Sequence, residues 1–86
     1  MENRIAVISI ILMDSNSASV VNSILTEYGQ YIIGRMGLPY KEKNVNIICV
    51  VIDASQNTIN TISGKLGKID GISVKANYVH KEKNVA

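Results

Sequence analysis

The side chains that could contact a small ligand lie in two short segments of the 86-residue sequence. Asp14 and Asn16 belong to the first, Asp14-Ser15-Asn16-Ser17, which follows a run of apolar residues. Where a strand passes into a helix, backbone N–H groups favour anions, and short polar side chains can hydrogen-bond a ligand. The same residue types cap helices, and capping alone would also account for this segment.

Arg35 stands between two glycines in the second segment, Gly34-Arg35-Met36-Gly37. Its guanidinium could bind a carboxylate or a phosphate through two parallel hydrogen bonds. Glycine within a strand often marks a bulge or the close approach of a ligand or partner. The alternative is an edge-strand bulge whose solvated arginine discourages pairing with another chain.

Other residues that carry chemistry are scarce. The chain has one histidine, His80, and one cysteine, Cys49, whereas a zinc site needs three or four ligands. Cys49 is predicted to be buried on a strand as a small hydrophobe, and His80 to be solvated. Residues 61–67 contain glycine, lysine and hydroxyls without the spacing of a phosphate loop. The sequence therefore predicts no catalytic residue, no metal site and no enzyme, and it identifies no cofactor.

The composition sets further limits. Apolar residues make up 47% of the chain and charged residues 19%, which excludes a disordered tail, and no apolar run is long enough for a membrane span. A formal charge of +2 and the lack of paired aromatic residues argue against direct nucleic-acid binding. A single cysteine is typical of a reducing compartment, so we expect a cytoplasmic protein.

The spacing of apolar residues predicts six elements in the order βαββαβ. Strands are expected at residues 5–13, 31–36, 46–53 and 72–79, and helices at residues 18–28 and from the cap at Ser55 to Gly67. Gly37-Leu38-Pro39 and residues 41–44 are expected to form a hairpin loop. The order predicts an α+β, ferredoxin-like fold, an antiparallel four-stranded sheet with two helices on one face. Residues 1–80 would form one domain, and residues 81–86 a charged C-terminal tail.

Both strands expected at the centre of this sheet are apolar on both faces. Residues 5, 7 and 11 point away from residues 6, 8, 10 and 12, and residues 47, 49 and 51 away from residues 48, 50 and 52. The face without helices therefore needs a cover, and a homodimer or homotetramer is the simplest one. Alternatively, the outer strands and the C-terminal tail shield it.

Three segments carry a family resemblance: residues 31–40 (YIIGRMGLPY), 46–53 (NIICVVID) and 63–67 (SGKLG). They resemble a family of proposed regulators of iron-only hydrogenase systems, which has an ACT-like fold similar to the regulatory domain of the nickel-responsive repressor. The resemblance implies a self-associating domain that senses a small molecule or metal. This chain lacks the several histidines of the nickel site, and residues 13–16 lack the glycine common in ACT domains that bind amino acids.

These observations together predict a stand-alone ACT-like regulatory module that binds a small ligand at an interface between subunits. Asp14, Asn16, Arg35 and Tyr40 are the predicted ligand-binding residues. The alternative is an interaction module without a ligand, which docks a partner protein, such as a hydrogenase maturation or regulatory protein, through its apolar sheet face. The sequence shows neither a helix-turn-helix nor a ribbon-helix-helix for direct DNA binding.

Overall fold

A computed structural model describes residues 2–79 of the chain. Its main elements are β1 (Asn3–Leu12), α1 (Ala18–Glu27), β2 (Ile32–Tyr40), β3 (Val45–Ser55), α2 (Gln56–Gly67) and β4 (Ile72–Tyr78). Short 3₁₀ segments occupy the connections: η1 (Ser15–Ser17), η2 (Gly29–Tyr31) and η3 (Lys41–Lys43). The predicted order βαββαβ is confirmed. The expectations for His80 and for a tail at residues 81–86 lie outside the described residues.

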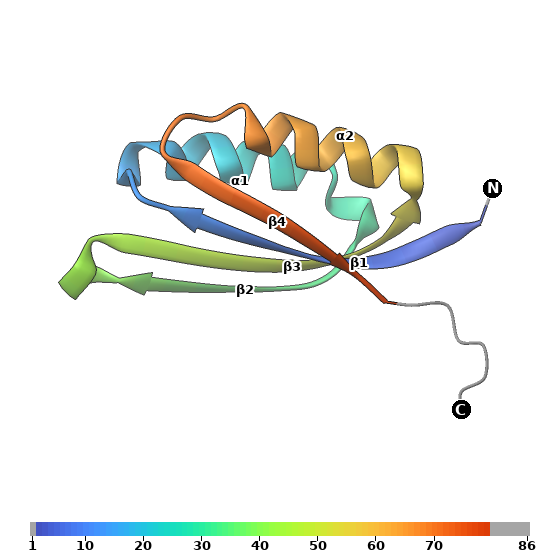
Figure 1. Cartoon of the computed structure of the whole chain (residues 1–86), viewed down its shortest axis with the longest axis horizontal. Helices are drawn as coiled ribbons and strands as arrows, with labels where there is room; N and C mark the ends of the chain where they lie inside the picture. The colour runs from blue at the N-terminus through green and yellow to red at the C-terminus, as the bar shows by residue number, and fades with distance from the viewer. Residues whose placement is uncertain (1, 80–86) are drawn as a thin grey trace.

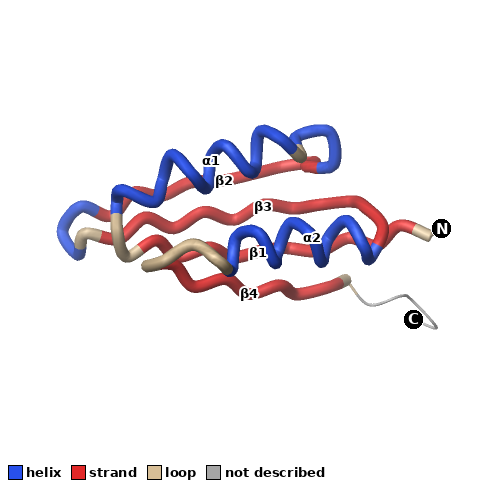
Figure 2. The backbone as a smooth tube through the Cα atoms, turned by 90° about the horizontal axis from the view of Figure 1, so that it is seen from above, coloured by secondary structure: helices blue, strands red, loops and turns tan. Residues whose placement is uncertain are grey.

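The four strands form one antiparallel sheet in the order β2-β3-β1-β4. As predicted, β1 and β3 occupy its centre. Both helices lie on one face, and the other face carries no helix (Figure 1). Seen from above, α1 runs beside β2, whereas α2 lies over β1 and β4 (Figure 2). The predicted ferredoxin-like architecture is therefore confirmed. Within residues 2–79, neither helix is long and apolar enough to cross a membrane.

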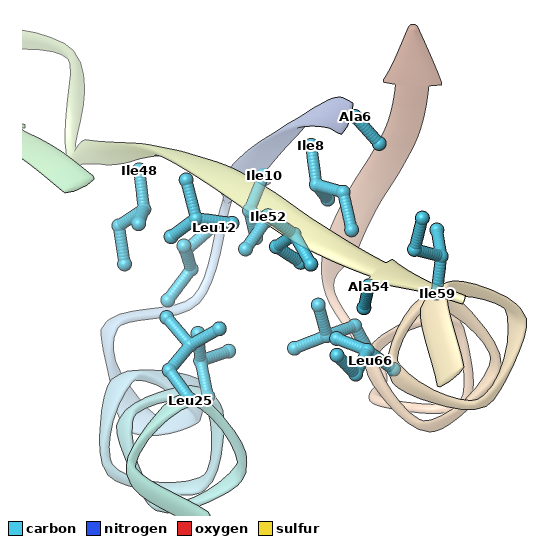
Figure 3. Close-up of a cluster of buried hydrophobic side chains, with 13 residues drawn as sticks. Ala6, Ile8, Ile10, Leu12, Leu25, Ile48, Ile52, Ala54, Ile59 and Leu66 are labelled. Carbon is cyan, nitrogen blue, oxygen red and sulfur yellow. The ribbon is translucent and has the colours of Figure 1, made fainter. Parts of the chain in front are cut away.

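The core lies between the sheet and the helices (Figure 3). Alternate residues of the central strands enter it, because successive side chains of a strand point to opposite faces. These core residues are Ala6, Ile8, Ile10 and Leu12 of β1, and Ile48, Val50, Ile52 and Ala54 of β3. From the helices come Val21 and Leu25 of α1, and Ile59, Ile62 and Leu66 of α2.

β2 is longer than the sequence predicts. Gly37-Leu38-Pro39 continues the strand instead of forming a loop, since Leu38 pairs with Ile47 and Pro39 with Asn46. Proline is tolerated here because β2 is an edge strand. The reversal is confined to η3 and to Asn44, whose φ of 56° is left-handed. A register shift between Ile32 and Gly34 confirms the bulge that Gly34 suggested.

Side-chain contacts hold the start of α2. At its start the Ser55 hydroxyl accepts a hydrogen bond of 3.2 Å from the Thr58 amide, which confirms the predicted cap. The Arg4 guanidinium lies 4.3 Å from the centre of the Tyr78 ring and donates to Gln56 Oε1 at 2.7 Å. The start of β1, the end of β4 and the first turn of α2 are thereby joined.

A second contact joins the C-terminal ends of the two helices. Lys65 Nζ of α2 lies 3.4 Å from Glu27 Oε2 and 5.0 Å from the centre of the Tyr28 ring. A side-chain hydrogen bond to Tyr28 and the charge of Glu27 raise the pKa of Lys65 above its ordinary value. Protonated Lys65 therefore favours the folded state below its unfolded pKa, and this contribution is lost as pH rises through the folded pKa.

Candidate functional site

The face of the sheet opposite the helices is mainly apolar. Residues paired directly across antiparallel strands share a face, and the register places Leu38, Ile47 and Ile11 in one row. We call this surface the helix-free face; its residues are Ile5, Val7, Ser9 and Ile11 of β1, Gly34, Met36, Leu38 and Tyr40 of β2, Val45, Ile47, Cys49, Val51 and Asp53 of β3, and Ser73, Lys75 and Asn77 of β4. Both faces of the central strands are thus apolar, as predicted.

Several large side chains on this face are open to solvent. Met36 is 63% exposed, Leu38 55% and Ile11 39%. Val7 and Val51, in the row next to that of Met36, are only partly covered by their neighbours. Contiguous apolar side chains exposed to water are costly, and on soluble proteins they usually mark an interaction surface.

Charge on the helix-free face is confined to its margins. Asp53 lies in the end row, beside Ile5, and Lys75 lies on the edge strand β4 between Ser73 and Asn77. These are the two charged residues of the set defined above, and their charges are opposite. The apolar part of the face therefore extends over β2, β3 and β1, with the polar β4 as its border.

Cys49 lies on the helix-free face rather than in the core. It pairs with Met36 on one side and Ser9 on the other, and it is half-buried. The prediction of a buried cysteine was wrong because the sequence does not show which face of β3 the helices cover. No group of three or more potential metal ligands occurs among residues 2–79.

Arg35 lies on the helix side of β2. It pairs with Val50, whose side chain is in the core, and its Nη2 donates to Asn22 Oδ1 of α1 at 2.7 Å. Asn22 also lines a shallow open groove on the surface of α1, together with Ser19, Ser23 and Thr26. The arginine is thus held at the junction of β2 and α1, where its remaining N–H groups can meet an anion from solvent.

Tyr40 ends β2 on the opposite face, where it pairs with Val45 and is 44% exposed. Asp14 and Asn16 lie at the same end of the sheet, after β1, and both are exposed. Asp14 Oδ1 accepts a hydrogen bond of 3.0 Å from the Asn16 amide. One of the four predicted residues, Arg35, therefore points to the other face from Tyr40, and the four do not converge within a single chain.

The connection from β1 to α1 is fastened to the turn before β4. Met13 N donates to Gly71 O at 2.8 Å, and the Ser17 hydroxyl donates to Asp70 O at 3.0 Å. Ser17, at the N-terminus of α1, makes no side-chain capping bond. Simple helix capping therefore does not explain this serine, because its hydroxyl joins two connections at one end of the sheet. No local pattern in the sequence indicates that contact.

Replacing Gly71 by alanine should destabilise the protein by about 1–3 kcal/mol. Its φ of +78° is left-handed, and an added Cβ would lie 3.0 Å from the Cβ of Asp14. Gly64→Ala is the matched control, because Gly64 lies in α2 with nothing within 4 Å of an added Cβ. It should stabilise by about 0.5–1 kcal/mol. Urea unfolding measures both, and equal stability of Gly71→Ala and the wild type would contradict a rigid junction.

Sequence reasoning missed two strongly exposed apolar residues of β2, Met36 and Leu38, as members of the helix-free face. The available signal was that Met36, Leu38 and Tyr40 occur at every second position. A strand places side chains with this spacing on the same face. It also missed Asn22 as the partner of Arg35, for which no local signal exists, since the two lie on different elements.

Comparisons with known proteins identify the family of this chain and agree with its fold. The TM1266-like family, described as proposed iron-only hydrogenase system regulators, matches residues 4–76. Among solved structures, the chain is similar to the TM1266 protein from Thermotoga maritima, with 35% sequence identity and a TM-score of 0.87. The match covers 92% of this chain and 100% of that chain. No curated protein matches this chain.

Proposed function

Because the chain belongs to the TM1266-like family of proposed iron-only hydrogenase system regulators, we propose that it is a stand-alone regulatory module that acts as a homo-oligomer. It senses a small ligand at an interface between copies and works in the cytoplasm. A regulator of this kind needs binding and a change of partner contacts, not catalysis. The family description and the lack of a predicted catalytic residue both favour this role over an enzyme.

The observation that supports the proposal is the helix-free face. A sheet with both faces apolar is typical of sheets covered on both sides. In this chain the helices cover one side only (Figure 1). Met36 and Leu38 remain exposed on the other side. A homodimer or homotetramer provides the missing cover without requiring another gene product.

The ligand site is proposed to draw on Asp14, Asn16, Arg35 and Tyr40. Arg35 supplies a fixed cation, held by Asn22, that suits a carboxylate or a phosphate. Asp14 and Asn16 lie on the connection fastened to Gly71. Since Tyr40 and Arg35 point to opposite faces of the sheet, a site that uses both needs residues from more than one copy.

The exposed apolar side chains also favour one second candidate, a module that docks a different protein through the helix-free face. This candidate requires no small ligand and no self-association. The two proposals differ in what the purified protein does alone: the first predicts an oligomer, and the second predicts a monomer.

Native mass spectrometry of the protein as purified should show a dimer or tetramer that carries additional mass. Arg35→Ala should keep the oligomer and lose the added mass, with ligand affinity at least about tenfold lower, because a charge-assisted hydrogen bond contributes about 1.5–3 kcal/mol. Arg35→Lys is the control, since it keeps the charge and loses the planar fork. Unchanged ligand retention in Arg35→Ala would remove Arg35 from the site, and a wild-type monomer would favour the second candidate.

A further inference from the structure

The centre of the helix-free face is occupied by Cys49. β3, which carries it, is flanked by Met36 of β2 and Ser9 of β1 in the same row. Apolar rows lie on both sides of this row along the strands: one contains Leu38 and Ile47, and the other contains Val51. Apolar residues therefore surround the thiol on the β2 side and in both directions along the strands, while Ser9 and the polar β4 lie on the fourth side.

We infer that a second copy of this chain packs its own helix-free face on this one, with Cys49 at the centre of the contact, opposite the partner's Cys49. The inference rests on the proposed homo-oligomer and adds to it which surface is buried and which residue lies nearest the symmetry axis. In a two-fold contact both copies use the same surface, so residues at its centre meet their own counterparts.

The charges of the face are compatible with a second copy. Asp53 and Lys75 sum to zero and lie at the margins, so stacking two identical faces brings no like charges together at the centre. Residues 80–85 of the same chain are a poor alternative cover, because all of them except Val85 are polar or charged: His, Lys, Glu, Lys and Asn. Such residues would bury charge on an apolar surface.

The size of the face also suits a dimer. With about 4.8 Å between strands and about 3.3 Å per residue, it is roughly 19 Å wide and roughly 26 Å long from Asp53 to Val45. This flat footprint of roughly 500 Å² underestimates the accessible surface, because side chains project from it. A standard protein interface buries about 800 Å² on each partner, so the helix-free face is of the order required.

The expected spacing keeps the two thiols apart. Packed sheets lie about 10 Å from one another, whereas a disulfide requires Cα atoms about 4.4–6.8 Å apart. The contact thus needs no covalent bond. It should instead shield Cys49, which is half-buried in the single chain, from any reagent in solution.

The test is the alkylation rate of Cys49 by iodoacetamide, followed by mass spectrometry of the wild-type protein at a series of protein concentrations. By mass action, a concentration about fifty times the dissociation constant leaves about a tenth of the chains monomeric, so the rate should fall about tenfold. The control is the double variant Cys49→Ser, Val20→Cys. Position 20 is exposed on α1, so the thiol introduced there should react at the same rate at every protein concentration.

Native mass spectrometry of the same samples separates the two levels of the proposal. An oligomer whose Cys49 is protected at high concentration supports the inference. An oligomer whose Cys49 reacts at the same rate at every concentration overturns it, because the copies then meet elsewhere, and the proposed homo-oligomeric regulator stands. A monomer at every concentration overturns the proposed homo-oligomer and the inference together.

Discussion

Leu38→Asp should dissociate the oligomer, weakening self-association by about 100-fold or more. Leu38 is exposed in the single chain, so the substitution leaves the fold intact. In the inferred contact the new carboxylate would be buried without a partner in either copy. An unpaired buried polar group costs on the order of 3 kcal/mol, and each 1.4 kcal/mol is about tenfold in affinity. Analytical ultracentrifugation across a concentration series measures the change.

Val20→Asp is the matched control for this substitution. The exposed fraction of Val20, 47%, is similar to the 55% of Leu38. Val20, however, lies on the outer surface of α1. The same charge placed there should leave the association constant unchanged. If Leu38→Asp and Val20→Asp sediment alike, the helix-free face is not the contact between copies.

Ile8→Ala should cost about 2–5 kcal/mol of unfolding free energy, the largest single effect on stability that we expect. Ile8 is fully buried beneath the helices on β1, where it pairs with Val50 and with Ala76. Truncation to alanine leaves a cavity between strand and helix that the packed core cannot fill. Urea unfolding should be measured at one fixed protein concentration, since self-association adds to apparent stability.

Ile5→Ala provides the comparison within the same strand. Ile5 lies on the helix-free face and is 37% exposed, so its truncation removes less buried surface and opens no enclosed cavity. Measured at concentrations where the protein is monomeric, Ile5→Ala should cost about 1 kcal/mol or less. Equal losses for the two variants would contradict the arrangement in which one face is covered and the other is open.

Much of the fold could be predicted because its signals are local. The alternation in β1 and β3, the apolar spacing of Ile59, Ile62 and Leu66, and the cap at Ser55 depend on neighbours in the sequence. The length of β2 could not be predicted in this way. Glycine and proline at positions 37 and 39 indicate a loop, and only the ladder with β3 keeps them in a strand.

The candidate site was harder to predict than the fold because it depends on which surfaces meet. Periodicity showed that β3 has two apolar faces, and it did not show that Cys49 lies on the uncovered one. Likewise, the glycines around Arg35 suggested an unusual backbone, while its partner Asn22 became evident only from the packing of α1 beside β2. Contacts between elements carry this information, and no short segment contains it.

The position of β1 has a consequence for synthesis on the ribosome. This strand pairs with β3 and β4, so Ala6 can pair only after Ile52 and then Tyr78 have been synthesised. At about 5–20 residues per second, a nascent strand that is apolar on both sides stays without its neighbours for seconds. We therefore expect the nascent chain to bind chaperones, and slower translation should increase the fraction of chains that aggregate.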